Sequence, residues 1–174
     1  MMSVERNGAV TFKGNAMTLV GPELKVGDKA PDFVVLPNLV ETASLKDTAG
    51  KTRLMSVVPS LDTGVCEAQT RRFNEEAGKL GDGVRVLTFS MDLPMAQTRF
   101  CSTHGIKNVV CYSDHKTGKF GEAYGTLIKE LRLLSRAIFV VGKDDEIKYI
   151  EYVKEMTQHP DYDKALAATK AAAK

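Results

Sequence analysis

Cys66 is the residue whose type and position in this sequence are best suited to nucleophilic chemistry. It follows the strand-like segment Arg53–Val58 after a short turn that begins at Pro59, and it lies at the start of a helical stretch. With Thr63 as the helix N-cap, Cys66 falls in the first turn, where the helix dipole favours an anion. Because the thiolate is the nucleophilic form of cysteine, this position predicts a reactive thiol.

The helical face that carries this thiol is apolar, since it also holds Phe73, Ala77 and Leu80. Burial on that face opposes ionisation of a thiol, so a neighbouring cation is needed to favour the thiolate. Arg136 is the candidate for this cation, because it precedes the apolar run Ala137–Val141 and its guanidinium keeps its proton. We therefore expect Arg136 to project from a strand end toward the first turn of the Cys66 helix.

The elements that must position these residues alternate between strands and helices. Apolar and β-branched runs predict strands at Arg53–Val58, Val84–Ser90, Val109–Tyr112, Ala137–Val141 and Lys148–Val153, with a further short apolar run at Asp32–Leu36. Helical patterns extend from the Thr63 turn to about Leu80, over Met95–His104 and over Asp161–Ala172. The segment Val10–Val20 contains a Gly-Asn turn and predicts a β-hairpin that precedes the core.

The resulting order, β-α-β-α-β-β-α, is typical of the thioredoxin-like fold. The sequence thus predicts an α/β protein with a central mixed β-sheet covered by helices on both faces, and with an N-terminal β-hairpin. No internal repeat or Pro/Gly/Ser-rich linker divides the chain, and 174 residues suit a single core. We therefore expect one domain over residues 1–174.

Composition and charge disfavour several classes of protein. Hydrophobic residues make up 43% and charged residues 26%, which is typical of a soluble globular protein. A net charge of +2 gives no indication of a nucleic-acid or anionic-membrane partner. Met1–Asn15 lacks a secretory signal and no apolar run approaches a membrane span, which predicts a cytoplasmic location. Three cysteines in a reducing compartment indicate free, metal-bound or catalytic thiols.

The spacing Pro-x-x-x-Thr-x-x-Cys from Pro59 to Cys66, together with the distant Arg136, resembles the active site of peroxiredoxins. Four further segments are similar to the bacterial thiol peroxidase subfamily, the atypical two-cysteine peroxiredoxins. They are Thr11–Asn15 (TFKGN), Val26–Phe33 (VGDKAPDF), Asp92–Cys101 (DLPMAQTRFC) and Leu134–Ala137 (LSRA). The resemblance extends from residue 10 to residue 141 and thus covers most of the chain.

The resemblance implies a peroxidase that needs no metal, haem or flavin, and it implies a role for each residue of the motif. Cys66 is then the peroxidatic cysteine, whose thiolate attacks the terminal oxygen of hydrogen peroxide or of an alkyl hydroperoxide. Thr63, Arg136 and first-turn amides donate hydrogen bonds to the peroxide oxygens, and Pro59 shields the sulfur. Cys101 is then the resolving cysteine, which condenses with the Cys66 sulfenic acid to form an intramolecular disulfide.

The same resemblance implies thioredoxin as the reductant of this disulfide and a homodimeric assembly. Cys66 begins on an inward face, and a disulfide needs Cα atoms within about 7 Å. We therefore expect the first turn of its helix and the Cys101 segment to unwind when the disulfide forms. Cys111 lies in the strand Val109–Tyr112, where we expect a buried structural residue, although its thiol could also compete with Cys101.

Functions of other classes must be weighed against this one. Cys101, His104, Cys111 and His115 supply the two sulfurs and two nitrogens of a zinc-binding module. Only six residues separate His104 from Cys111, fewer than the roughly 12 usual in zinc fingers, which disfavours this interpretation. A non-catalytic thioredoxin-like binding scaffold remains open. A disulfide oxidoreductase is disfavoured, because Thr63 occupies the first cysteine position of a Cys-x-x-Cys motif.

Overall fold

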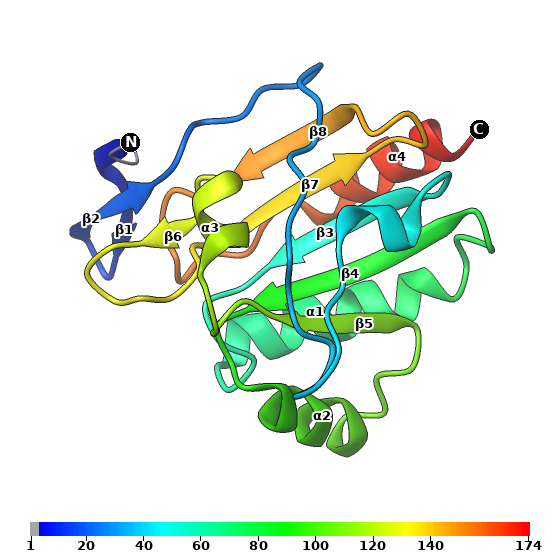
Figure 1. The fold of residues 1–174 in the computed structure, drawn as a ribbon, viewed down its shortest axis with the longest axis horizontal. Coiled ribbons are helices and arrows are strands. Elements are labelled where there is room, and N and C mark those ends of the chain that lie inside the picture. The colour runs from blue at the N-terminus through cyan, green and yellow to red at the C-terminus, as the bar shows by residue number, and fades with distance from the viewer. Residues whose placement is uncertain (1–3) are drawn as a thin grey trace.

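The computed structural model describes residues 4–174. Its centre is a five-stranded mixed sheet with the strand order β5-β4-β3-β7-β8 (Figure 1). The strands are β3 (Thr52–Val57), β4 (Val84–Ser90), β5 (Val109–Ser113), β7 (Ala137–Val141) and β8 (Ile147–Tyr152). β3, β4 and β5 run parallel, whereas β7 pairs antiparallel with β3, and β8 antiparallel with β7. This is the α/β, thioredoxin-like arrangement that the sequence predicts.

A smaller antiparallel sheet stands beside the central one. It is formed by β1 (Glu5–Phe12), β2 (Asn15–Val20) and the two-residue strand β6 (Leu127–Ile128). β1 and β2 are joined by Lys13 and Gly14, both with positive φ angles. Such angles suit a tight hairpin turn, and glycine adopts them without steric strain. The predicted N-terminal hairpin is confirmed, and its first strand begins five residues earlier than predicted.

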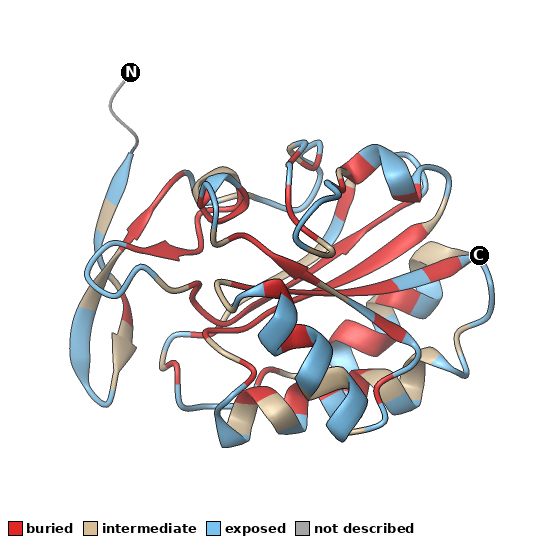
Figure 2. Cartoon of the chain, turned by 60° about the horizontal axis from the view of Figure 1, so that its bottom comes forward, coloured by how far each residue is buried: buried red, intermediate tan, exposed pale blue. Residues whose placement is uncertain are grey.

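Side chains of the central strands alternate between two apolar layers. The helices are α1 (Gly64–Ala77), α2 (Pro94–Thr103), α3 (Lys119–Ala123) and α4 (Tyr162–Ala173). α1, α2 and α4 pack on one face of the sheet, as Figure 2 shows from below. The other face is covered by α3 and by the segment between β2 and β3, which contains the short 3-10 helix η1 (Leu45–Thr48). No helix within residues 4–174 is long and apolar enough to span a membrane.

Several details differ from the prediction. A mixed sheet flanked by helices is confirmed, but the three long helices share one face. α1 ends at Ala77 rather than at about Leu80. Asp32–Leu36 is not a strand, because it forms only isolated bridges through Val35 and Leu36. The sequence does not predict α3 and β6 between β5 and β7, because segments of five and two residues are too short to show periodicity.

Candidate active site

The loop of residues 59–62 leads from β3 into α1 and places Cys66 in the first turn of this helix. Thr63 is the N-cap, as the sequence predicts, with extended backbone angles. Its hydroxyl does not cap the helix, because Oγ1 donates to the carbonyl oxygen of Ser60 at 3.1 Å. Cys66 has an exposed fraction of 0%. The thiol therefore lies at the positive end of α1 and out of contact with water.

Arg136 directly precedes β7 and reaches Cys66 from the neighbouring strand end. Its Nη2 lies 3.4 Å from Cys66 Sγ, and the residue is only 2% exposed. Nη1 donates to Gln69 Oε1 at 2.8 Å, while Nε and Nη2 donate to the carbonyl oxygen of Met156 at 3.1 and 2.9 Å. Gln69 donates in turn to Ser56 Oγ on β3 at 2.7 Å. The guanidinium is thus held in a fixed position with one edge directed at the sulfur.

Among the residues that the structure describes, Arg136 has no carboxylate partner. None of the ion pairs within residues 4–174 includes this residue. Its acceptors other than Cys66 are a neutral side-chain amide and a neutral backbone carbonyl. Because the guanidinium keeps its proton, a positive charge is fixed beside the sulfur. Charges attract more strongly where water is excluded, so this arrangement stabilises a negative sulfur or a negative oxygen at the same place.

Two groups that position Arg136 are not among the residues predicted from the sequence. Gln69 lies three residues after Cys66, a spacing that places both side chains on one helix face and that indicates a neighbour of the thiol. Met156 acts through its backbone carbonyl, for which a side-chain pattern gives no signal. It lies in the connection between β8 and α4, which folds back over Arg136.

A largely apolar pocket of about 320 Å³ opens beside the charge. Its lining includes Phe12, Pro59, Thr63, Val65, Leu133 and Arg136. Cys66 is not part of this lining, since it is covered completely. Arg136 both lines the pocket and contacts Cys66 Sγ, so the guanidinium connects the pocket to the buried thiol. A small molecule with an apolar tail would therefore meet a positive charge at the inner end of the pocket.

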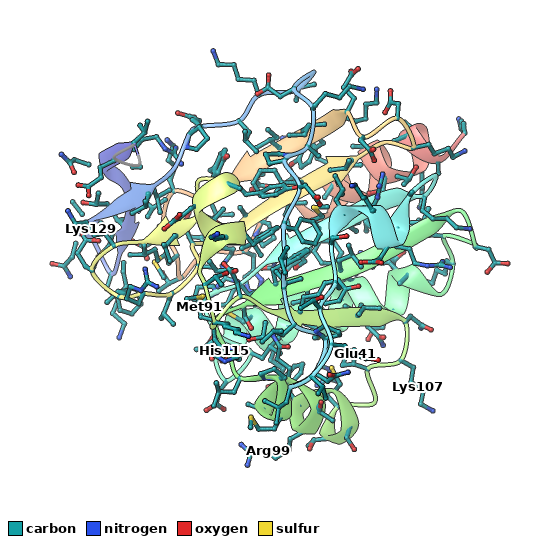
Figure 3. The ribbon with its side chains drawn as sticks, viewed as in Figure 1. Glu41, Met91, Arg99, Lys107, His115 and Lys129 are labelled. Atoms are coloured by element: carbon teal, nitrogen blue, oxygen red, sulfur yellow. The ribbon has the colours of Figure 1, made fainter. Side chains whose placement is uncertain are left out.

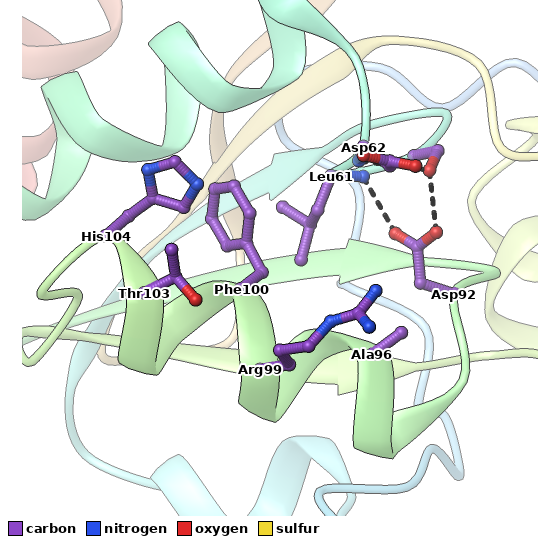
Figure 4. Close-up of a pocket in the computed structure, with 9 residues that line it drawn as sticks. Leu61, Asp62, Asp92, Ala96, Arg99, Phe100, Thr103 and His104 are labelled. Atoms are coloured by element: carbon purple, nitrogen blue, oxygen red, sulfur yellow. Dashed lines mark hydrogen bonds between the residues drawn. The ribbon is translucent and has the colours of Figure 1, made fainter.

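Asp92 fastens the 59–62 loop to the segment that leads into α2. Its Oδ1 accepts a hydrogen bond from Ser60 Oγ at 2.7 Å, and its Oδ2 accepts from the Leu61 backbone N–H at 2.8 Å. Ser90 Oγ, at the end of β4, also donates to Oδ2 at 2.7 Å. Figure 4 shows the bonds from Ser60 and Leu61 at one end of a second pocket, of about 310 Å³, between the loop and α2. The loop before Cys66 is thus tied to the segment that leads into α2, the helix that carries Cys101.

The wall of this second pocket opposite the loop is formed by α2 and the residue that follows it. Arg99, Phe100 and His104 line the pocket from this side (Figure 4). Arg99 extends from α2 at the edge of the molecule (Figure 3). His104 Nδ1 lies 3.3 Å from Glu67 Oε1 of α1, so the two helices are linked next to both cysteine-bearing segments.

Cys101 lies on α2, and its thiol contacts that of Cys111 on β5, with 3.4 Å between the two Sγ atoms. All three cysteines are free thiols. The hydrogen bond between the two thiols lowers the pKa of Cys101. The same bond, together with burial, raises the pKa of Cys111 well above its ordinary value. The prediction that Cys111 is buried is wrong, because this residue is only partly buried. Its thiol contacts that of Cys101, the predicted resolving cysteine.

The four residues of the zinc alternative do not converge on one point. His104 faces Glu67, and His115 Nδ1 shares a hydrogen bond with Ser113 Oγ at 2.9 Å. In the part of the chain that the structure describes, no three His, Cys, Asp or Glu side chains are arranged to hold a metal ion. This geometry contradicts the zinc-module interpretation.

A thioredoxin-like sheet with a cysteine in the first turn of the helix after β3, set against a buried arginine, defines a thiol-based redox protein. The Redoxin family model matches residues 25–166. The chain is 60% identical to the thiol peroxidase of Halalkalibacterium halodurans, over 94% of this chain and 98% of that protein. It is 58% identical to the thiol peroxidase of Bacillus subtilis, over 95% and 98% of the two chains. A peroxiredoxin-like protein from Aquifex aeolicus has a similar structure, with a TM-score of 0.88, 40% identity and 99% of each chain covered. The chain therefore belongs to the Redoxin family, and within it to the thiol peroxidases, which confirms the family predicted from the sequence.

Proposed function

We propose that this chain is a thiol-dependent peroxidase in which Cys66 attacks the peroxide and Cys101 resolves the product. The observation that carries this function is the 3.4 Å contact between Cys66 Sγ and Arg136 Nη2, in a buried place where no carboxylate of residues 4–174 forms an ion pair with the guanidinium. The thiol peroxidases to which the chain is similar support the same activity.

The first step forms a sulfur–oxygen bond and breaks the oxygen–oxygen bond. The Cys66 thiolate attacks the terminal oxygen of the hydroperoxide, and the departing oxygen takes a proton and leaves as an alcohol or as water. Cys66 is thereby oxidised by two electrons to a sulfenic acid, and the peroxide is reduced. Arg136 stabilises the thiolate first and then the negative charge that develops on the departing oxygen.

Thr63 contributes an acceptor rather than a donor in this geometry. Its single hydroxyl hydrogen is directed to the carbonyl oxygen of Ser60, so the lone pairs of Oγ1 remain available for the O–H of the peroxide. The sequence-based expectation that Thr63 donates to the peroxide would require release of the Ser60 bond. Pro59 is buried, has no N–H and lines the pocket beside Thr63, so it keeps water from the reacting atoms.

The substrate class follows from the pocket. Hydrogen peroxide needs only the charge and the hydrogen-bonding groups at the inner end. Alkyl hydroperoxides gain in addition from the apolar walls, to which Phe12, Leu131 and Leu133 contribute. We therefore infer that the enzyme reduces both and that it favours alkyl hydroperoxides.

The second step joins Cys66 to Cys101 and releases water from the sulfenic acid. Of the two thiols in contact, Cys101 is the better nucleophile, because its hydrogen bond with Cys111 lowers its pKa. Since Cys66 is fully buried, the first turn of α1 must open for the two sulfurs to meet, and the bonds of Asp92 to the 59–62 loop must break. Equally slow hydrogen exchange of residues 63–70 and 95–105 in both redox states would contradict this opening.

A dithiol protein of the thioredoxin class then restores both thiols by exchange with the disulfide. We further propose a cytoplasmic homodimer, as the family resemblance implies. Sedimentation velocity of the reduced and oxidised protein tests the dimer, and a single species with the mass of one chain in both states would contradict it.

The test is peroxide reduction by the purified protein with thioredoxin, thioredoxin reductase and NADPH. We expect Cys66→Ser to abolish turnover, and Cys101→Ser to consume one equivalent of peroxide and then stall. Steady-state activity in Cys66→Ser would overturn the function assigned to that sulfur. If the wild-type protein left the peroxide unchanged, the alternative of a non-catalytic binding scaffold would replace the enzyme.

A further inference from the structure

Cys101 and Cys111 are placed so that they can form a disulfide with each other. Their Sγ atoms are 3.4 Å apart, and a disulfide bond of about 2.05 Å requires them to approach by only a little more than 1 Å. Cys101 lies near the end of α2, and Cys111 lies on β5 in register with Thr88 of β4. This pair can therefore close within the folded protein, whereas the joining of Cys101 to the buried Cys66 requires α1 to open.

Cys111 also lies next to the surroundings of Cys66. It packs, together with Phe100, against the buried cluster of Val58, Leu61 and Cys66. Because β5 is a strand of the central sheet, Cys111 remains in place when the neighbouring helical turns unwind. It is thus positioned to meet Cys101 again when α2 returns to the sheet.

We propose that Cys111 is a third redox-active thiol, which takes Cys101 from Cys66 by thiol–disulfide exchange; this inference rests on the function proposed above. The Cys111 sulfur attacks the Cys101 sulfur of the Cys66–Cys101 disulfide. The Cys101–Cys111 bond forms and the Cys66–Cys101 bond breaks. The Cys66 sulfur leaves with the electron pair as a thiolate, and the proton of Cys111 is released. No net oxidation or reduction takes place, so the step needs no further reactant.

Two features of the structure favour this direction of exchange. The released Cys66 sulfur returns to a place beside the Arg136 charge, which stabilises it there as a thiolate. The new disulfide joins Cys101 of α2 to Cys111 of β5, which are already in contact in the reduced protein. The first turn of α1 can therefore refold, and the 59–62 loop can form its bonds to Asp92 again. The disulfide is thereby moved from the buried Cys66 to the partly exposed Cys101–Cys111 pair. Cys66 is then reduced again before any external reductant arrives.

The sequence allows a direct test, because trypsin places each cysteine on its own peptide. The three peptides are Leu54–Arg71, Phe100–Lys107 and Asn108–Lys116. The reduced full-length protein receives one equivalent of cumene hydroperoxide without any reductant. Samples are quenched in acid over time, free thiols are labelled with N-ethylmaleimide, and the peptides are mapped by mass spectrometry.

We expect a link between Leu54–Arg71 and Phe100–Lys107 first, and its replacement by a link between Phe100–Lys107 and Asn108–Lys116. Labelling of Cys66 should fall and then recover as the second link forms. If the first link persisted until a reductant was added, with Cys111 labelled throughout, the exchange would be refuted while the proposed function stood. If Cys66 stayed labelled and the peroxide remained, the proposed function itself would fail.

Two variants separate exchange from direct oxidation of the pair. In Cys111→Ser the first link should form and persist, so that the recovery of Cys66 labelling is lost. In Cys66→Ser one equivalent of peroxide should produce no link between Cys101 and Cys111. A Cys101–Cys111 link in that variant, at the rate seen in the wild type, would show that the pair is oxidised directly and would overturn the exchange.

Discussion

Two arginines are buried on opposite faces of the same sheet, and their surroundings differ in one decisive respect. Arg53 of β3 is 0% exposed and lies 2.6 Å from the carboxylate of Asp145. It also donates to Thr48 Oγ1 and to the carbonyl oxygen of Gly142. Arg136 is 2% exposed, and its acceptors are an amide, a carbonyl and a sulfur.

The comparison shows how burial of a cation can serve stability in one place and chemistry in another. The charge of Arg53 is compensated within the fold, so that it joins η1, β3 and the turn after β7. The charge of Arg136 is positioned by neutral groups and stays available for an anion. In the proposed reaction that anion is the thiolate of Cys66 and then the departing oxygen.

Removal of the Arg136 charge should have the largest effect. We expect Arg136→Met to slow the reaction of Cys66 with hydroperoxide roughly 100- to 1,000-fold, as loss of a preorganised charge at the reacting atoms typically does. Stopped-flow single-turnover measurements on the folded protein give this rate constant. A decrease of less than about threefold would contradict the role assigned to the charge.

The matched change on the other face should affect stability rather than rate. Arg53→Met leaves Asp145 without its ion-pair partner and the acceptors of η1 without their donor. We expect a loss of about 3 kcal/mol in the free energy of unfolding. Urea unfolding measures this loss. The single-turnover rate of the protein that remains folded should equal that of the wild type, and a rate as low as that of Arg136→Met would remove the distinction between the two arginines.

Gln69→Glu gives Arg136 the carboxylate partner that Arg53 already has, with almost no change of shape. The new carboxylate can accept from Ser56 Oγ, whose hydroxyl rotates, so the hydrogen bonds of the site can be retained. Because the guanidinium charge is then shared, we expect the peroxide reaction to slow roughly 10-fold, equivalent to about 1.4 kcal/mol in the barrier. The same single-turnover assay checks this expectation, and an unchanged rate would show that geometry matters and net charge does not.

Asp145→Asn is the converse change and should have the smallest effect. Asp145 has a positive φ angle of 60°, which asparagine tolerates, and its side chain is 48% exposed. We expect a loss of about 1 kcal/mol in unfolding free energy, since a half-exposed partner is screened by water. Urea unfolding of this variant, next to Arg53→Met, shows how much of the Arg53 effect depends on the ion pair.

Local patterns in the sequence predict the elements that carry the site. The predicted boundaries of β4 and β7 agree with the structure, because their apolar residues form clear runs. The placement of Thr63 at the N-cap and of Cys66 in the first turn follows from the strand-to-helix turn. Arg136 can be selected because it directly precedes a predicted strand and forms part of the family resemblance.

The remaining features depend on contacts between segments far apart in the sequence. The Met156 carbonyl reaches Arg136 only because the connection after β8 returns to the strand end. The contact between Cys101 and Cys111 depends on how α2 packs against β5, which a pattern of apolar residues does not specify. Such contacts are set by tertiary packing, so sequence periodicity predicts the strand of Cys111 and not its partner.

Whether the sulfur of Cys66 attacks the peroxide can be tested by trapping the sulfenic acid that this attack produces. The Cys101→Ser variant is treated with one equivalent of cumene hydroperoxide in the presence of dimedone, which reacts with sulfenic acids, and its tryptic peptides are then mapped. We predict an adduct on Leu54–Arg71 that depends on Arg136, so that it becomes scarce when Arg136→Met is added. An adduct on Asn108–Lys116 instead, or none while the peroxide persists, would contradict the account.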